Sequence, residues 1–158
     1  MKIKLVTPTL TQWMLLVNIA GMALSIFMWH TAITQKVIGC LTGGGCEIVL
    51  HSPYSKIFAV PIAAYGLAFY GVNSLITVFR LIDDRPILRI ATWKMSGIGI
   101  LASLYFLYLE IVPIKAFCSW CTVSTFLTIF LLIISLVEIK RHGGIKSAWL
   151  EFISLFNR

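Results

Sequence analysis

Four cysteines are the residues of this chain whose type and spacing point to chemistry. Cys40 and Cys46 lie on either side of a glycine run at positions 43–45. Cys118 and Cys121 form a Cys-Ser-Trp-Cys motif near the start of a late apolar segment. Motifs of the Cys-x-x-Cys type commonly contain a thiol of lowered pKa, and their disulfides are easily opened. The two pairs together predict a relay of electrons between dithiols and disulfides.

The Cys-x-x-Cys pair is expected at the beginning of a helix. Charged Glu110 and Lys115 mark a turn, and the next long apolar run begins at Ala116. Cys118 should then lie in the first helical turn, where unpaired amides and the helix dipole favour a thiolate. The three-residue offset puts Cys121 on the same helical face, one turn deeper. A thiol at that depth is accessible to a lipid-soluble oxidant.

The upstream pair is built differently. Three glycines at positions 43–45 give the backbone wide conformational freedom and predict a mobile arm. We expect residues 48–50 to form a short amphipathic turn on the membrane surface. That turn would bring Cys46 near the start of the last apolar segment and leave Cys40 more exposed.

The composition is that of a membrane protein. Hydrophobic residues make up 59% of the chain, charged residues 12%, and the mean hydropathy is +0.93, whereas soluble domains contain about 25% charged residues. A bilayer core needs about 20 mainly apolar residues per helix. The predicted fold is all-α and integral to the membrane, a bundle of four transmembrane helices in one domain (1–142), with helices at about 11–30, 57–79, 90–109 and 116–137.

The basic residues predict the orientation of the bundle. With a cytoplasmic N-terminus, ten of the thirteen Lys and Arg residues lie on the cytoplasmic side, and Lys36, Lys56 and Lys115 lie outside. Both termini are then cytoplasmic, and the cysteines with their glycine loop are extracytoplasmic, where disulfides persist. The first helix is expected to be retained, because its apolar run is longer than that of a signal peptide. The net charge of +7 is spread over helix ends, so no nucleic-acid partner is expected.

The C-terminal segment, residues 143–158, follows two glycines that should end the fourth helix. Its apolar residues recur on one helical face, which predicts an amphipathic helix lying on the cytoplasmic leaflet. These residues are Ile145, Trp149, Phe152, Ile153 and Phe156.

From about residue 39 to residue 125 the chain resembles the bacterial vitamin K epoxide reductase family, in its form without a fused thioredoxin-like domain. The similarity consists of the Cys-x5-Cys loop with its glycines, the Ser52-Pro53-Tyr54-Ser55 segment before the second helix, and the Cys-x-x-Cys that opens the fourth. It implies an enzyme of the bacterial inner membrane that supports disulfide bond formation. It also implies that Ser52 supports the site.

The resemblance implies a route for the electrons. A separate thioredoxin-fold protein of the DsbA type attacks an oxidised loop pair at Cys40. Cys46 then exchanges with Cys118, and Cys121 passes the electrons to a membrane quinone, ubiquinone or menaquinone. In the family the quinone pocket lies among the four helices near the Cys-x-x-Cys. The residues that we expect to line it are Phe58, Tyr65, Phe69, Phe117 and Thr125.

Other interpretations of the same residues remain open. The four cysteines are also compatible with two static disulfides, or with a zinc site, although zinc sites of four cysteines usually combine shorter Cys-x2-4-Cys spacings. An oxidase of the DsbB type would place its Cys-x-x-Cys in the first outer loop, the reverse of the order found here. Ser52 alone is typical of a cap or turn residue. Trp120 is expected in the aromatic belt at the membrane interface.

Overall fold

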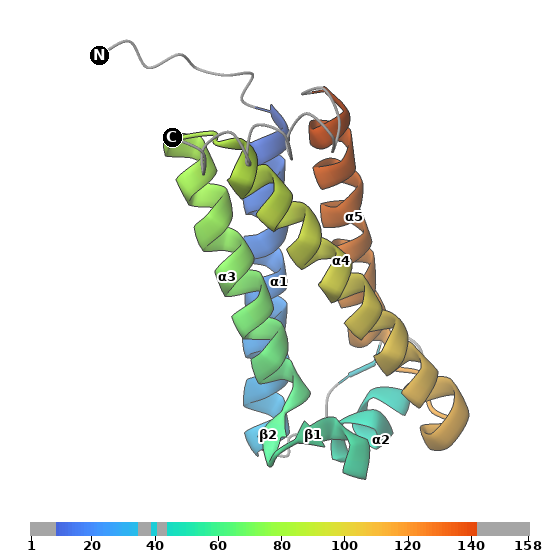
Figure 1. The fold of residues 1–158 in the computed structure, drawn as a ribbon. Coiled ribbons are helices and arrows are strands. Elements are labelled where there is room, and N and C mark those ends of the chain that lie inside the picture. The colour runs from blue at the N-terminus through green and yellow to red at the C-terminus, as the bar shows by residue number, and fades with distance from the viewer. Residues whose placement is uncertain (1–8, 35–38, 41–43, 142–158) are drawn as a thin grey trace.

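The computed structural model describes residues 9–34, 39–40 and 44–141, and four long helices dominate them (Figure 1). All four are long and apolar enough to cross a membrane. The structure therefore confirms the predicted bundle of four membrane-spanning helices. The helices are α1 (Thr9–Thr34), α3 (Ile62–Ile82), α4 (Pro86–Leu109) and α5 (Ser119–Arg141). The predicted C-terminal amphipathic helix, residues 143–158, lies outside the described residues.

The second membrane helix begins five residues later than predicted. Residues Lys56–Ile57 (β1) pair with Val60–Pro61 (β2) in a small antiparallel hairpin, and only then does α3 start. Phe58 and Ala59 form the turn with positive φ angles of 49° and 64°. The prediction was wrong here because a short apolar run does not distinguish a strand from the start of a helix.

The third membrane helix is longer than predicted at both ends. It begins at Pro86. Proline is favoured in the first helical turn because the N–H that it lacks would have no partner within the helix. It then continues into a π-helical turn, η2 (Glu110–Ile114), which contains Pro113. Lys115 ends this turn in the left-handed conformation, with a φ of 53°. The chain thereby reverses direction into α5.

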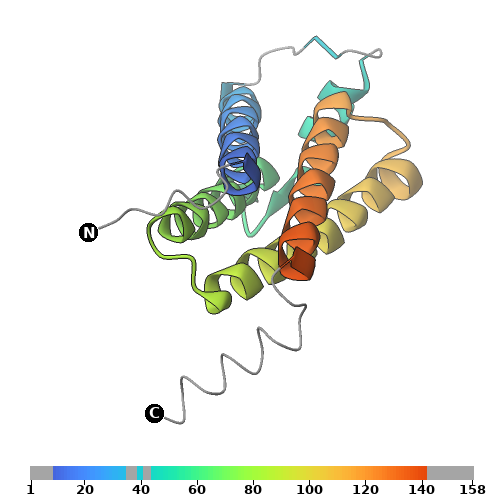
Figure 2. The ribbon, with the colours of Figure 1, turned by 90° about the horizontal axis from the view of Figure 1, so that it is seen from above.

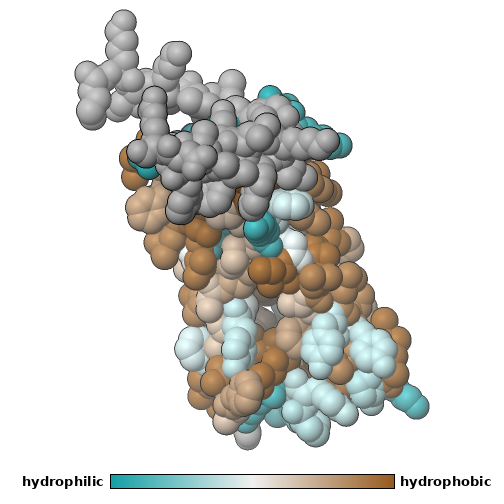
Figure 3. Space-filling model, viewed as in Figure 1, coloured by the Kyte–Doolittle hydropathy of each residue, from teal (hydrophilic) through white to brown (hydrophobic). Residues whose placement is uncertain are grey.

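The helices form a ring in which α1 neighbours α3 and α5, and α4 neighbours the same two helices (Figure 2). Glycines allow close approach where large side chains meet them, as is usual between membrane helices. Gly21 lies against the ring of Tyr70, and Gly99 lies against Phe69 and Thr128, so neither position has room for a side chain. Hydrophobic side chains dominate the middle of the face shown in Figure 3, as expected of a surface in contact with lipid.

The two ends of the bundle differ in content (Figure 1). One end carries the turn between α3 and α4, the start of α1 and the end of α5. There the buried Arg80 pairs with Glu138 at 2.6 Å. The other end carries the hairpin, the turn between α4 and α5, the short helix α2 (Gly45–His51) and the 3-10 turn η1 (Pro53–Ser55). All four cysteines lie at this second end, called here the cysteine end.

Candidate redox site

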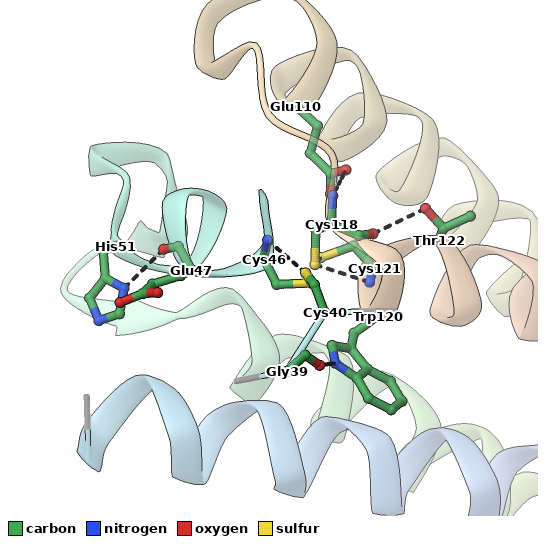
Figure 4. The surroundings of a disulfide bond; sticks show 10 residues. All are labelled: Gly39, Cys40, Cys46, Glu47, His51, Glu110, Cys118, Trp120, Cys121 and Thr122. Atoms are coloured by element: carbon green, nitrogen blue, oxygen red, sulfur yellow. Dashed lines mark hydrogen bonds between the residues drawn. A yellow bond between two sulfur atoms is a disulfide. The ribbon is translucent and has the colours of Figure 1, made fainter. Parts of the chain in front are cut away.

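Cys40 and Cys46 form a disulfide at the cysteine end (Figure 4). Cys46 lies in the first turn of α2 and is completely buried, whereas Cys40 is only partly buried. The backbone N–H of Cys46 donates a hydrogen bond of 2.9 Å to the sulfur of Cys40. The sequence predicted this difference in exposure, which leaves Cys40 as the sulfur more accessible from outside.

Gly45 brings this loop against the start of α5. A side chain at Gly45 would overlap the backbone nitrogen and carbonyl oxygen of Phe117, whereas Gly44 has no neighbour within 4 Å of the corresponding position. Position 45 therefore requires glycine because two backbone segments approach each other closely there. Of the predicted mobile arm, residues 41–43 lie outside the described residues.

The helix α5 begins at Ser119, three residues later than predicted, so Cys118 directly precedes it and does not lie inside its first turn. Its carbonyl oxygen accepts the first helical hydrogen bond, from the N–H of Thr122 at 3.1 Å. Its sulfur accepts a bond of 3.3 Å from the N–H of Cys121. Cys118 thus occupies the N-cap position, where a side-chain acceptor satisfies an otherwise unpaired helix amide. This explains why the site favours a thiolate there.

The two sulfurs of the Cys-x-x-Cys pair lie 2.7 Å apart and are not bonded to each other. The thiol of Cys121 donates to the sulfur of Cys118, and this hydrogen bond is the main cause of a lowered Cys118 pKa. Burial opposes the effect, and the N–H groups of Cys121 and Trp120 add to it. The pKa of Cys118 is therefore below that of an ordinary cysteine, even though Cys118 is completely buried.

The two cysteine pairs meet in one packed cluster. Cys46 and Cys118, both fully buried, belong to the same cluster with Met28, and Cys40 and Cys121 pack against it. Figure 4 shows the loop disulfide beside the Cys-x-x-Cys pair. Residues more than seventy positions apart in the sequence are thus brought into one packed cluster by α2 and the start of α5.

Glu110 lies beside this cluster, held by the π-helical turn η2. Its side chain is 3% exposed, and one carboxyl oxygen accepts a hydrogen bond of 3.1 Å from the backbone N–H of Cys118. The carboxyl group and the sulfurs of Cys118 and Cys121 all lie within 4.8 Å of one another. From the sequence, Glu110 was expected only to mark a turn. The available signal was a carboxylate eight residues before a cysteine, within an apolar segment.

A cavity of about 300 Å³ opens among the helices beside Cys121. Its volume lies at the lower end of the range for small-molecule sites. Three of the predicted contacts line it: Tyr65, Phe69 and Thr125. Phe58 and Phe117 do not line it. Phe58 lies at the turn of the hairpin with 94% of its surface exposed, and Phe117 is about half exposed. We therefore correct these two placements.

The cavity also contains polar groups that were not predicted from the sequence. The buried hydroxyl of Tyr70 is hydrogen bonded to the hydroxyls of Ser124 at 3.0 Å and Thr128 at 3.2 Å, and all three residues line the cavity. The hydroxyl of Thr125 donates to the carbonyl of Cys121, and that of Tyr65 donates to the carbonyl of Ile57. The Tyr70 group is thus the better candidate for contact with a polar ligand atom.

Ser52 and Trp120 hold the loop in place. The hydroxyl of Ser52 donates to the carbonyl of Val49 at 2.8 Å, which stabilises the end of α2, and Ser52 also lines the cavity. The indole N–H of Trp120 donates to the carbonyl of Gly39 at 3.3 Å, one residue before Cys40. Trp120 therefore contacts the loop in addition to its expected place near the membrane interface.

Comparison with known proteins identifies the family. A profile of the vitamin K epoxide reductase family matches residues 12–136. The chain belongs to this family. It is also 29% identical over 122 residues to the thiol-disulfide oxidoreductase LTO1 of Arabidopsis thaliana, an alignment that covers 72% of this chain and 32% of the relative. The chain thus spans about a third of that relative's length. Membership of the family removes the alternative of a DsbB-type scaffold.

Proposed function

We propose that this protein is a thiol oxidoreductase that takes electrons from a thioredoxin-fold protein of the DsbA type and passes them to a membrane quinone, ubiquinone or menaquinone. The reaction would support disulfide bond formation. One observation carries the proposal: a loop disulfide and a Cys-x-x-Cys pair pack against each other beside a cavity within a membrane bundle. Membership of the vitamin K epoxide reductase family supports it.

The exposures of the sulfurs suggest the order of exchange. A thiolate of the partner attacks the partly exposed Cys40, which releases Cys46, and the second thiol of the partner then resolves the mixed disulfide. Cys46, buried in one cluster with Cys118, attacks the sulfur of Cys118 in the oxidised Cys-x-x-Cys pair and releases Cys121. Cys40 closes the loop disulfide again. The Cys-x-x-Cys pair is then reduced, which is the state described by the structure.

The cavity has the chemistry that a quinone ring needs. Apolar and aromatic side chains form most of its wall, Phe69 among them, and Cys121 lies at its edge. The hydroxyl group of Tyr70 with its neighbours Ser124 and Thr128 offers hydrogen bonds to a carbonyl oxygen. When bound, a quinone supplies an acceptor for two electrons and two protons. In this site Ser52 stabilises the end of α2 and the adjoining wall of the cavity.

We further propose that the cysteine end faces the periplasm, with the protein in the bacterial inner membrane and both termini in the cytoplasm. The distribution of basic residues supports this orientation. Among the residues that the structure describes, the cysteine end carries two basic residues, Lys56 and Lys115. The opposite end and its adjoining helical turns carry Arg80, Arg85, Arg89, Lys94, Lys140 and Arg141.

The test is quinone reduction by the purified protein in detergent, with a reduced thioredoxin-fold oxidase as donor and the absorbance of the quinone as readout. Cys121→Ala should abolish the reaction, and Cys118→Ala should trap a mixed or loop disulfide on a non-reducing gel. Cys40→Ala should stop reduction driven by the protein donor but leave reduction driven by dithiothreitol. Full activity of Cys118→Ala or Cys121→Ala would overturn the relay.

A second measurement separates catalysis from structural disulfides. Thiol labelling of isolated membranes, with and without a quinone analogue, should show a quinone-dependent change in the redox state of Cys118 and Cys121. A membrane protein with purely structural disulfides would show none. Metal analysis of the same protein tests zinc, since a carboxylate and two thiolates are also zinc ligands.

A further inference from the structure

Glu110 is a buried carboxyl group that lies within 4.8 Å of the sulfurs of Cys118 and Cys121. One of its oxygens accepts the N–H of Cys118 at 3.1 Å, and the group also interacts with the thiol of Cys121 (Figure 4). It lines the cavity in which the proposed quinone would bind, and it is the only Asp or Glu among the described residues that does so. The backbone fixes it as well, because the carbonyl of Glu110 accepts the N–H of Ala116 at 3.1 Å.

The proposed reaction requires proton movement at this place. A dithiol that closes to a disulfide releases two protons and two electrons, and a quinone that becomes a quinol takes up the same number of each. Cys118 has no exposed surface, and Cys121 is only partly exposed and lies at the edge of the cavity. A proton that leaves Cys121 therefore needs an acceptor within the site.

We propose that Glu110 is the proton-transfer residue of this site, an inference that rests on the proposed function. Glu110 accepts the proton of the Cys121 thiol as that sulfur gives up its electrons, and it then donates this proton to a quinone oxygen. Cys118 reacts as the thiolate when the Cys118–Cys121 disulfide closes, so the second proton of the quinol comes from water, to which Cys118 lost its own proton on ionising. Two thiols thus lose two protons and two electrons, the quinone gains both, and Glu110 returns to its original charge.

A purely structural role for Glu110 is the competing explanation, because a carboxylate at the start of a helix satisfies free amides. The two roles respond differently to substitution. The side-chain oxygen of Gln accepts the same N–H from Cys118 but carries no exchangeable acid proton. Asp retains the acid but is one methylene shorter. A structural role predicts that E110Q is the milder change, and proton transfer predicts that E110D is.

The other ionisable groups around Glu110 are few. At the start of α5 it faces Cys121 and, just before that helix, Cys118. Lys115, in its own turn, is exposed, as are Glu47 and His51 on α2, which packs against η2. The remaining ionisable groups of the cavity wall are tyrosines, at positions 54, 65 and 70. An ionisation in the pH profile of quinone reduction that disappears in E110Q is therefore assigned to Glu110 or to its coupling with the two thiols.

The experiment compares wild type, E110Q, E110D and the control E47Q, which removes an exposed negative charge from the same end of the molecule. Quinone reduction is followed from protein reduced beforehand, over a range of pH. Exchange between the thioredoxin-fold donor and the Cys40–Cys46 disulfide is followed separately, without quinone. Infrared difference spectra between the oxidised and the reduced protein, also without quinone, report the carboxyl band of Glu110.

We expect E110Q to lower kcat for quinone reduction about 100-fold, within the range of general acid–base catalysis. E110D should fall between E110Q and wild type, E47Q should match wild type, and exchange at the loop disulfide should be unchanged in all variants. The carboxyl band should change on reduction in wild type and be absent in E110Q. Equal kcat of E110Q and wild type at every pH, or E110D slower than E110Q, would overturn the inference. Wild type without Cys121-dependent quinone reduction would instead overturn the proposed function.

Discussion

At the scale of single residues, the reactivity of the site depends on the ionisation of Cys118. The thiol of Cys121 donates to its sulfur, and the N–H groups of Cys121 and Trp120 add to the stabilisation of the thiolate against the effect of burial. The pKa of Cys118 is therefore below its usual value. Since only the thiolate is nucleophilic, Cys118 should react at a pH at which an ordinary cysteine is still protonated.

Removal of the hydrogen-bond donor should reverse this shift. In Cys121→Ala the sulfur of Cys118 loses its main stabilising partner, so the pKa of Cys118 should rise and its thiolate should appear only at higher pH. The measurement is thiolate absorbance in the ultraviolet against pH, with the loop disulfide intact. Cys121→Ser, whose hydroxyl donates a hydrogen bond, serves as the control and should retain a lowered pKa. An unchanged titration in Cys121→Ala would show that the amides alone set the pKa.

The residues of the site differ in how far the sequence predicted them. Cysteine spacing was sufficient for the two sulfur pairs, because a Cys-x-x-Cys at the start of an apolar segment has few other uses. Glu110 and Tyr70 were missed as site residues, because their importance depends on which helices meet around the cavity. Phe58 was misplaced for a related reason, since the turn of the hairpin is formed by residues that look like part of an apolar helix.

At the scale of elements, the site depends on the approach of α2 to the start of α5. The sequence predicted both elements, but it suggested flexibility as the reason for the glycines. The structure shows close backbone contact instead at Gly45, where a side chain would overlap Phe117. This contact holds Cys46, the next residue, in the same cluster as Cys118.

Gly45→Ala should therefore separate the two cysteine pairs. The added methyl group meets backbone atoms that cannot move without displacing α2 or α5. We expect exchange between the loop pair and the Cys-x-x-Cys pair to slow at least about tenfold, an effect of about 1.4 kcal/mol on the barrier. The readout is the rate of quinone reduction with the protein donor, beside the rate of its exchange with the loop disulfide alone.

Gly44→Ala is the matched control for this prediction. Gly44 has no neighbour within 4 Å of the added methyl group and has a φ of −65°, which any residue adopts. The rate of quinone reduction by Gly44→Ala with the protein donor should remain that of wild type. Equal slowing in both variants would mean that chain flexibility matters at these glycines, and an unaffected Gly45→Ala would mean that the two elements move apart during exchange.

At the scale of the whole molecule, the candidate redox site and the buried Arg80–Glu138 ion pair lie at opposite ends of the bundle. The cysteines lie at one end, and the Arg80–Glu138 pair lies at the other, with Thr11 of α1 bonded to Glu138 at 3.0 Å and Thr92 of α4 bonded to Arg80 at 3.3 Å. One ion pair thus connects all four membrane helices. The sequence does not indicate this pairing, because it depends on how the helices are arranged.

Loss of one partner from this pair should destabilise the bundle without altering the redox site. Among the described residues, Glu138→Ala leaves Asp84, at 3.5 Å, as the remaining ion-pair partner of the buried guanidinium of Arg80. The expected cost is about 3–5 kcal/mol of unfolding free energy, measured by detergent denaturation, while the Cys40–Cys46 disulfide still forms. Asp83→Asn, which breaks the exposed pair with Arg85, should cost less than about 1 kcal/mol. The double variant Arg80→Met/Glu138→Leu should regain most of the loss, because no buried charge is then left unpaired. Similar losses in Glu138→Ala and Asp83→Asn would show that the ion pair does not hold the four helices together.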